Sequence, residues 1–327
     1  MRKLTGWLLI LSLLIGLCGC ARQSEPEPTA APEKVVVGFS QLGAESSWRI
    51  ANTQSMVSAA ENYGFALMME NANQKQDLQI RSIRSFIASR VDVIVFSPIV
   101  ETGWDNVLRE ARDAGIPVIL MDRMIETADD GLYTAYVGAD FYAEGRRAGE
   151  YLIRKADALG AERMNIVEIS GTIDSTPMRD RQRGFMDVIG ADSRFAVIDS
   201  ISGDFLRSKG EECMSLLLER WGAEGIDVVY SHNDSMTLGA LDVLDRAGLR
   251  PGQDMLMISV DGEAEAVREL KNGRINCIVQ CTPALGGSVM SLVQGLVNRR
   301  SVPKVSHPVE SAFTDFDDLT DPAMEGF

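Results

Sequence analysis

Residues 35–69 read VVVGFSQLGAESSWRIANTQSMVSAAENYGFALMM, and this stretch indicates the fold class. The β-branched run 35–39 is typical of a buried strand, and a second apolar run follows at residues 65–69. Between them, residues 48–63 carry apolar side chains at helical spacing and end before Gly64, a common helix stop. The stretch therefore predicts a strand, a helix and a second strand.

The same alternation continues along the chain. Further strands are expected at 91–96, 117–121, 164–169, 195–198, 228–230, 255–260 and 275–280, and helices at 78–87, 104–114, 142–159, 178–189, 205–221, 236–247 and 264–271. Repeated strand–helix units predict α/β architecture, with parallel sheets covered by helices on both faces. Because the strands are too many for one open sheet of ordinary size, we expect two similar lobes.

The N-terminus has the composition of a secretory signal at residues 1–19. Arg2 and Lys3 precede an apolar run at 7–17, which is shorter than the ~20 residues of a membrane span. Leu17-Cys18-Gly19-Cys20 resembles the bacterial lipobox, which would place a lipid on Cys20. The proline-rich segment 20–33 then predicts a flexible tether. An uncleaved anchor helix is the alternative, and either interpretation places the remaining chain outside the cytoplasm.

Charge and cysteine content exclude several classes of function. If Arg2 and Lys3 are removed with the signal, 30 of the 32 basic residues remain. The 47 acidic residues then give the chain a formal charge of −17. Such an acidic chain argues against nucleic-acid binding and against a basic membrane patch. Cys277 and Cys281 would lie ~13 Å apart along one strand, too far for a disulfide. With Cys213 they are expected to be buried apolar residues, and the two histidines complete no familiar zinc spacing, so neither metal nor cofactor is expected.

Polar side chains follow the predicted strands, where open α/β sheets bind ligands. They are Glu45 with Trp48 and Arg49, then Asp122-Arg123, Arg179, Asn233-Asp234, Asp261-Gly262 and Gln280. Carboxylate, amide and guanidinium groups together suit sugar hydroxyls, which both donate and accept hydrogen bonds, and an indole can pack on a sugar ring. Singly, each has an ordinary structural explanation: a surface pair, a core tryptophan, a helix cap or a turn.

Several ordered motifs carry a family resemblance. The chain resembles the periplasmic sugar-binding proteins of ABC transporters, in the ribose-binding branch. The motifs are Val-Ile-Leu-Met-Asp122-Arg123, Arg179-x5-Phe185, Ser-His-Asn233-Asp234 and Ser-Val-Asp261-Gly262. Glu45-Ser-x-Trp48-Arg49 and Ser-Gly-Asp204-Phe205-x-Arg207 are similar to the galactofuranose-binding subgroup.

The resemblance implies two Rossmann-like lobes joined by three crossing strands, the fold of type I periplasmic binding proteins. The lobes would comprise residues 34–138 plus 283–308 and residues 139–282 plus 309–327. By the same resemblance, a monosaccharide would bind in the cleft by hinge closure, and the subgroup's pattern favours a furanose such as galactofuranose. A monomer that delivers it to an ABC transporter permease is expected. The resemblance implies that the residues in contact with the ligand are Trp48, Arg49, Asp122, Arg123, Arg179, Asn233, Asp261 and Glu45.

Two positions depart from the pattern. Gln280 replaces a glutamate of the subgroup, which removes an acceptor and leaves the sugar's identity open. Phe141 stands where the family usually has asparagine, and the preceding Asp140 is either a contact near the hinge or a helix cap.

Three other classes of function share features with this sequence or must be distinguished from it. Cytoplasmic repressors share this fold but carry an N-terminal helix-turn-helix, where this chain has a signal and tether. A sensory module that docks on a membrane receptor or sensor kinase would have the same binding site. An enzyme is not expected, because the sequence contains no nucleophile elbow, phosphate loop or His-based triad.

Overall fold

A computed structural model describes residues 34–327. The predicted signal, tether and lipidated Cys20 lie outside these residues. The first lobe is built on a six-stranded parallel sheet, in which β11, β5, β4, β3, β1 and β2 are neighbours in that order. Its strands are β1 (Val36–Gln41), β2 (Ala66–Asn71), β3 (Val93–Phe96), β4 (Val118–Met121), β5 (Ala135–Val137) and β11 (Val305–Ser306).

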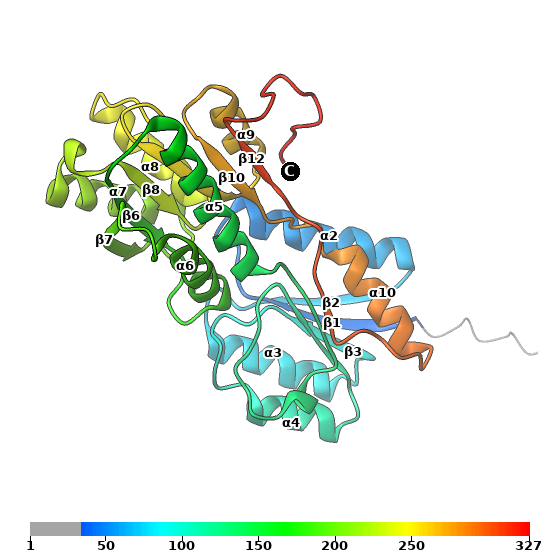
Figure 1. The fold of residues 1–327 in the computed structure, drawn as a ribbon. Coiled ribbons are helices and arrows are strands. Elements are labelled where there is room, and N and C mark those ends of the chain that lie inside the picture. Colours follow the sequence, from blue (N-terminus) through cyan, green and yellow to red (C-terminus); the bar gives the residue numbers. More distant parts are fainter. Residues whose placement is uncertain (1–33) are drawn as a thin grey trace, which may run out of the picture. The chain divides into compact units, whose positions relative to one another are not determined.

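Helices cover both faces of the first sheet. The pair α2 (Ser47–Tyr63) and α10 (Gly286–Val297) lies on one face, and α3 (Gln76–Ala88) and α4 (Asp105–Asp113) lie on the other (Figure 1). Strand β3 shows why the sheet needs two covers: Val93 and Val95 belong to the core under α2, whereas Ile94 and Phe96 belong to the core under α3 and α4. Successive strand residues point to opposite faces, so a continuous apolar run is buried on both.

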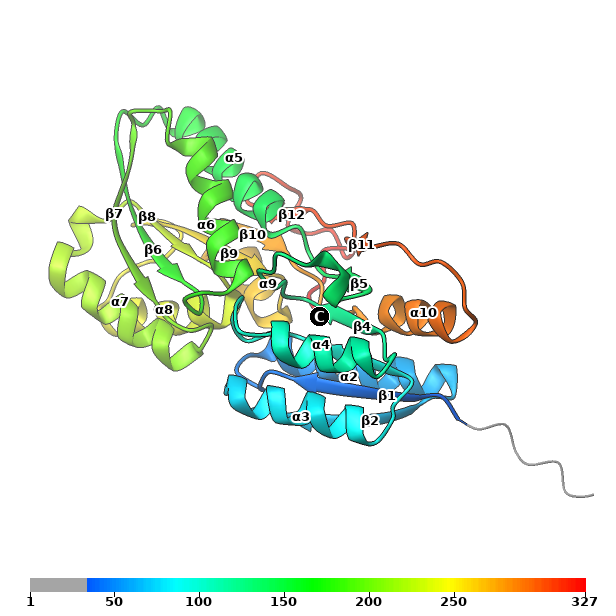
Figure 2. The same cartoon turned by 90° about the horizontal axis from the view of Figure 1, so that it is seen from below.

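The second lobe has the same plan with one reversed edge strand. Its sheet order is β12, β10, β9, β8, β6, β7, and only β12 runs antiparallel to its neighbour. The strands are β6 (Met164–Ser170), β7 (Phe195–Ser202), β8 (Val228–Ser231), β9 (Leu256–Asp261), β10 (Cys277–Gln280) and β12 (Ala312–Thr314). Helices α5 (Phe141–Leu159) and α6 (Thr176–Ile189) pack on one face (Figure 2), and α7 (Arg207–Trp221), α8 (Asp234–Arg246) and α9 (Ala264–Lys271) pack on the other.

The chain passes between the two sheets three times, at residues 138–140, 281–285 and 307–311. One hydrophobic core accompanies these crossings, because Trp48, Phe141, Cys281 and Leu285 belong to the same cluster of buried residues as strands of both sheets. The lobes are therefore joined both by three chain segments and by continuous apolar packing.

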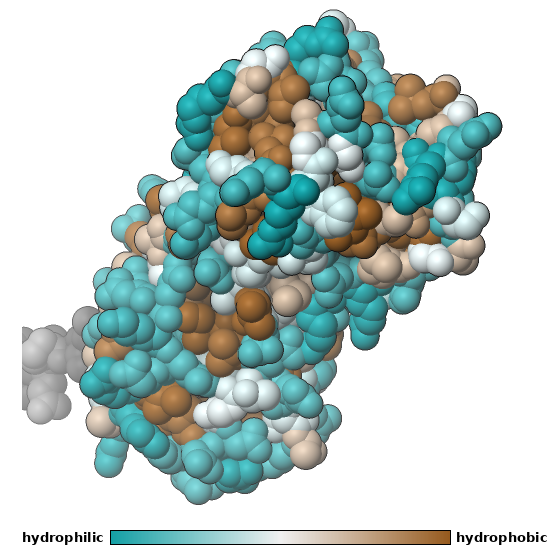
Figure 3. Space-filling model, turned by 90° about the vertical axis from the view of Figure 1, so that its left-hand side faces the viewer, coloured by the Kyte–Doolittle hydropathy of each residue, from teal (hydrophilic) through white to brown (hydrophobic). Residues whose placement is uncertain are grey.

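The predicted architecture of two parallel-sheet lobes is confirmed. The sequence reading missed β5, β11, β12 and helix α10, and it placed the end of β7 four residues early. Cys213, Cys277 and Cys281 are free and buried, as expected. Among helices of residues 34–327, none has the length and hydropathy of a membrane span. Figure 3 shows a face that is mostly hydrophilic, interrupted by separate hydrophobic patches.

Candidate ligand-binding site

A small pocket lies between the lobes and takes residues from both. It contains about 320 Å³ of space, including the part open to solvent. The lining residues are Glu45, Ser46, Trp48, Arg49, Asp122, Arg123, Phe141, Pro177, Arg181, Phe205, Asn233, Asp261 and Cys281. Most are charged or aromatic, so the pocket is built for a compact polar ligand.

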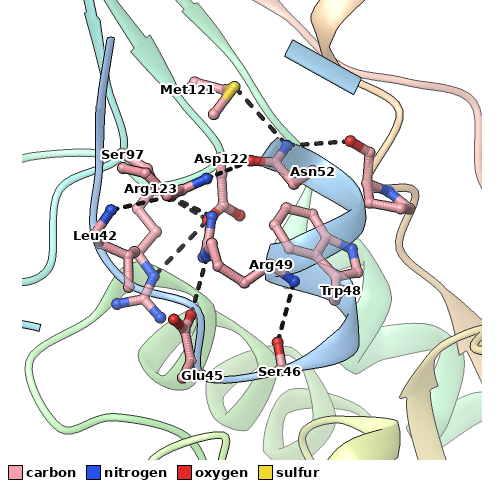
Figure 4. A network of polar contacts seen from close by, with 12 residues as sticks. Leu42, Glu45, Ser46, Trp48, Arg49, Asn52, Ser97, Met121, Asp122 and Arg123 are labelled. Atoms are coloured by element: carbon pink, nitrogen blue, oxygen red, sulfur yellow. Dashed lines mark hydrogen bonds and ion pairs between the residues drawn. The ribbon is translucent and has the colours of Figure 1, made fainter. Parts of the chain in front are cut away.

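Arg49 is the centre of the first lobe's contribution (Figure 4). Ser46 caps α2 by accepting a hydrogen bond from the Arg49 backbone N–H at 3.2 Å, which starts the helix at the pocket. The guanidinium then donates to Glu45 Oε1 at 3.0 Å and to Asp122 Oδ2 at 2.6 Å. Burial opposes its charge, but Asp122 and Glu45 outweigh burial and hold the pKa of Arg49 above its ordinary value.

Asp122 and Arg123 follow β4. Asp122 has a φ of 66°, which non-glycine residues seldom adopt, and it accepts a further hydrogen bond from Ser97 Oγ at 3.1 Å. Arg123 donates to the Ile99 carbonyl at 3.0 Å, and its Cζ lies 5.3 Å from the centre of the Phe205 ring. Burial, with repulsion from Arg49, lowers the pKa of Arg123 to about 10, so it remains charged at neutral pH.

Asp261 and Arg181 are the charged residues that the second lobe contributes to the pocket lining. Asp261 ends β9 with a φ of 128°, and Arg181 lies on α6 with its Nη2 3.9 Å from Asp261 Oδ1. Arg181 also donates to Glu144 Oε2 at 2.7 Å and to the His232 carbonyl at 2.6 Å. Burial raises the pKa of Asp261 well above its ordinary value, despite the nearby Arg181. Arg181 is therefore an ion-pair partner of Asp261, but at 3.9 Å the two groups do not form a hydrogen bond.

Within residues 34–327, three buried polar atoms of the lining residues have no hydrogen-bond partner: Glu45 Oε2, Arg123 Nε and Asp261 Oδ2. Each unmet group costs about 1–3 kcal/mol. Two acceptors and one donor from three separate segments are therefore left for a ligand that both donates and accepts hydrogen bonds.

Trp48 links the pocket to the second crossing segment. Its Nε1 donates to the Cys281 carbonyl at 2.8 Å, and Asn52, one turn along α2, donates to the Pro283 carbonyl at 3.1 Å. The Arg49 Cζ lies 4.7 Å from the centre of the Trp48 ring. Trp48 is therefore both a core residue and a pocket wall.

Asn233 caps α8 at the pocket. Its Oδ1 accepts from the Met236 N–H at 3.0 Å and its Nδ2 donates to the Phe205 carbonyl at 3.3 Å. The adjacent Asp234 accepts from the Gly262 and Glu263 N–H groups, both at 2.7 Å, and so fixes the turn after Asp261. The capping role considered from the sequence is present, and it coexists with a place in the pocket.

Three of the predicted contacts do not line the pocket. Asp140 caps α5, accepting from the Ala143 N–H at 2.9 Å, so the helix-cap interpretation describes it. Gln280 accepts from Ser311 Oγ and lines a neighbouring cavity. Arg179 pairs with Glu101 and Asp180 outside the pocket.

The place expected for Arg179 is taken by Arg181. Residues two apart on an α-helix are separated by about 200° around its axis, so these two arginines lie on different faces of α6. The sequence also did not reveal Ser46, Phe141, Pro177, Phe205 and Cys281 as lining residues. Phe205 stood inside a quoted motif, and Phe141 had been noted only as a departure from the family.

Glu144, Cys281 and Glu310 form a group, within residues 34–327, whose potential ligand atoms lie within 4.8 Å of one another. Arg181 already donates to Glu144, and Glu310 Oε1 accepts from the Thr282 N–H at 2.7 Å. With two carboxylates engaged by protein donors, the group gives no reason to expect a metal ion.

Comparison with known proteins places this geometry in a family. Residues 37–301 match the family model described as a periplasmic binding protein domain. Galactofuranose-binding protein YtfQ of Escherichia coli is 41% identical over 266 residues, covering 81% of this chain and 82% of that protein.

Two solved structures are also similar. A Mycobacterium smegmatis protein in complex with β-D-fucofuranose has a TM-score of 0.83 at 42% identity, covering 86% of this chain and 92% of that one. The binding protein of a Shewanella arabinose ABC transporter, bound to α- and β-L-arabinofuranose, has a TM-score of 0.82 at 38% identity, covering 85% and 91%.

Two lobes with a polar pocket between them define a solute-binding protein. The chain belongs to the periplasmic binding protein family. Membership places the folded body outside the cytoplasm and identifies a binding protein rather than an enzyme.

Proposed function

We propose that this protein binds a furanose monosaccharide between its lobes, closes around it by hinge motion, and delivers it to the permease of an ABC importer. The observation that carries the proposal is a set of three buried atoms at one pocket, Glu45 Oε2, Arg123 Nε and Asp261 Oδ2, which accept or donate no hydrogen bond in the described part of the chain. A sugar presents adjacent hydroxyl groups, each of which can donate to a carboxylate or accept from a guanidinium.

Apolar groups of the pocket support the same ligand class. Trp48, Phe141 and Phe205 line it beside the charged residues, and aromatic rings pack against the C–H faces of sugar rings. The small volume favours a monosaccharide over an oligosaccharide. A furanose is preferred because, of three similar proteins, one is a galactofuranose-binding protein and two have structures bound to β-D-fucofuranose and L-arabinofuranose.

The proposal includes a membrane anchor. The lipobox-type sequence ending at Cys20 supports cleavage after Gly19 and lipidation of Cys20, with residues 20–33 as a tether to a monomeric body. Substituting Cys20→Ser should release the protein from the membrane fraction, and mass spectrometry should show loss of the lipid. Retention of the variant in the membrane would contradict the anchor.

A thermal-shift panel of furanoses and pyranoses tests the ligand class. A sugar at ~100 times its Kd should stabilise the protein by about 2.7 kcal/mol, and titration calorimetry should then give one site per chain. Failure of every sugar to shift the transition would overturn the proposal. Sugar-dependent ATP hydrolysis by the reconstituted permease would support delivery, whereas activation of a sensor kinase alone would replace delivery with sensing.

A further inference from the structure

We propose that Arg179 and Glu101 form a latch between the lobes that slows release of the sugar without touching it. The inference rests on the proposed function for its ligand. Arg179, which was expected to contact the ligand, would then have a different role, and Glu101, which belongs to none of the motifs, would have one as well.

The ion pair joins the two lobes directly. Glu101 lies in the loop between β3 and α4 of the first lobe, and Arg179 lies in the first turn of α6 in the second. Arg179 Nη1 donates to Glu101 Oε2. Neither residue lines the pocket, so the pair can change lobe closure without removing a ligand contact.

Main-chain bonds hold Glu101 in place for this contact. Its N–H donates to the Asp174 carbonyl of the second lobe at 3.0 Å, and its carbonyl accepts from the Glu126 N–H of the first lobe at 2.8 Å. Nearby, the Met124 N–H donates to Thr176 Oγ1 at 3.2 Å, again across the lobes. The ion pair is therefore part of a set of polar contacts between the lobes.

The polar contacts between the lobes involve residues that are adjacent in sequence to pocket residues. Met124 follows the pocket residue Arg123, and Thr176 precedes the pocket residue Pro177. Movement of the lobes that exposes the pocket along this edge must break the bonds between Glu101 and the α6 segment. Breaking them is a step in release, so the latch should act on the dissociation rate.

Charges around Glu101 make Arg179 important. Burial raises the pKa of Glu101, and the carboxylates of Asp180, Glu126 and Asp174 act in the same direction. Arg179 is the cation that opposes them. The Glu101 side chain is 10% exposed, unlike an ordinary surface carboxylate, so loss of its partner should be felt more than loss of a surface pair.

The test compares Arg179→Gln, Glu101→Gln and the double variant by stopped-flow tryptophan fluorescence with the tightest sugar of the panel. Each single variant should raise the dissociation rate about three- to tenfold and change the association rate less than twofold. The double variant should cost no more than either single change, because both remove the same interaction. Arg179→Lys should restore most of the slow release.

A matched control is available within one lobe. Arg84 pairs with Glu110 in the first lobe, and its side chain is 52% exposed, against 51% for Arg179. Arg84→Gln should leave both rates unchanged. Additive effects in the double variant, or unchanged dissociation in both single variants, would overturn the latch.

Distances between the lobes, measured without sugar, test the latch independently of the proposed ligand. Spin labels at Ser85→Cys and Ser208→Cys, exposed positions on the first and second lobes, report closure of the unliganded full chain. The fraction of short distances should fall in Arg179→Gln and not in Arg84→Gln. If wild type bound no sugar, the proposed function would fail while this measurement still decided the latch, and identical distributions would refute it.

Discussion

Asp122 and Asp261 occupy matching places in the two lobes. Asp122 directly follows β4, Asp261 ends β9, and both have a positive φ, 66° and 128° respectively. Such backbone conformations cost non-glycine residues of order 1–3 kcal/mol and concentrate at functional sites. The strained positions bring a carboxyl group from each lobe to one pocket, so we expect both lobes to contact the ligand.

Asp261→Asn should weaken sugar binding at least 100-fold in titration calorimetry. The change replaces a buried carboxyl oxygen that we assign to sugar hydroxyls by an NH₂ group, which donates hydrogen bonds and cannot accept them. Asp140→Asn is the matched control, because asparagine preserves a helix cap and Asp140 lies outside the pocket. Equal affinity of the two variants would contradict the assignment of Asp261.

Arg181→Gln should abolish detectable binding, whereas Arg179→Gln should weaken it no more than tenfold. Arg181 lines the pocket and also pairs with the buried Glu144, so the single change leaves that carboxylate without its cation. Adding Glu144→Gln should recover stability in urea unfolding but not sugar affinity. Recovery of both would show that Arg181 only supports the fold.

Trp48→Phe should weaken binding about tenfold and lower the free energy of unfolding by about 1–2 kcal/mol. Phenylalanine keeps most of the apolar contact but loses the hydrogen bond to the Cys281 carbonyl, which ties α2 to a crossing segment. Trp221→Phe also loses an indole hydrogen bond, to Asp199, at an exposed site. It should leave affinity unchanged, and parallel losses in the two variants would point to a general effect.

Gly184→Ala should destabilise the protein by about 1–3 kcal/mol. A Cβ at Gly184 would lie 2.1 Å from the Tyr142 carbonyl oxygen, where α6 packs closely on α5. The matched control is Gly287→Ala in α10, where a Cβ would meet nothing within 4 Å. That variant should be neutral or slightly stabilised, and urea midpoints compare the two.

Stability should decrease as pH rises from about 5 to 8 because of Glu310. Burial, with repulsion from Glu144, raises the pKa of Glu310 to about 8, above about 4.3 in an unfolded chain. The folded state therefore retains a proton that the unfolded state has released, and the free energy of unfolding falls by at most about 1.4 kcal/mol per pH unit. Nearby Arg181 and Arg147 oppose the shift without reversing it.

Glu310→Gln should flatten this dependence and raise stability at pH 8, as measured by urea unfolding from pH 5 to 9. Glu325→Gln, an exposed control, should follow the wild type. An unchanged slope in Glu310→Gln would assign the dependence to another buried acid.

The apolar periodicity predicted most of the fold. A sheet covered on both faces requires continuous β-branched strands and amphipathic helices, and both patterns are strong in this sequence. The elements that the sequence did not reveal are short or atypical. Strand β5 has three residues and β11 has two. Helix α10 begins with Gly286-Gly287 and is apolar on average, so it lacks the polar face of a typical surface helix.

The site was predictable to the level of strand ends, but not of side-chain direction. Asp122, Asn233 and Asp261 lie at or just after the ends of strands that meet at the cleft. Their place in the sequence relative to these strands was therefore enough to predict that they lie there. The choice between Arg179 and Arg181 depends on the rotation of α6, which packing against α5 determines. Gln280 and Cys281 differ by one residue at a strand end, where a single step reverses the face.

The three crossings also constrain how the chain can acquire its structure. Helix α10 places Val289, Met290 and Val293 in the core that α2 shares, although over 220 residues separate the two helices. The first lobe therefore cannot complete its core until almost the entire chain has been synthesised. This order suits an exported protein, because a chain whose first lobe cannot yet fold stays unfolded while it crosses the membrane.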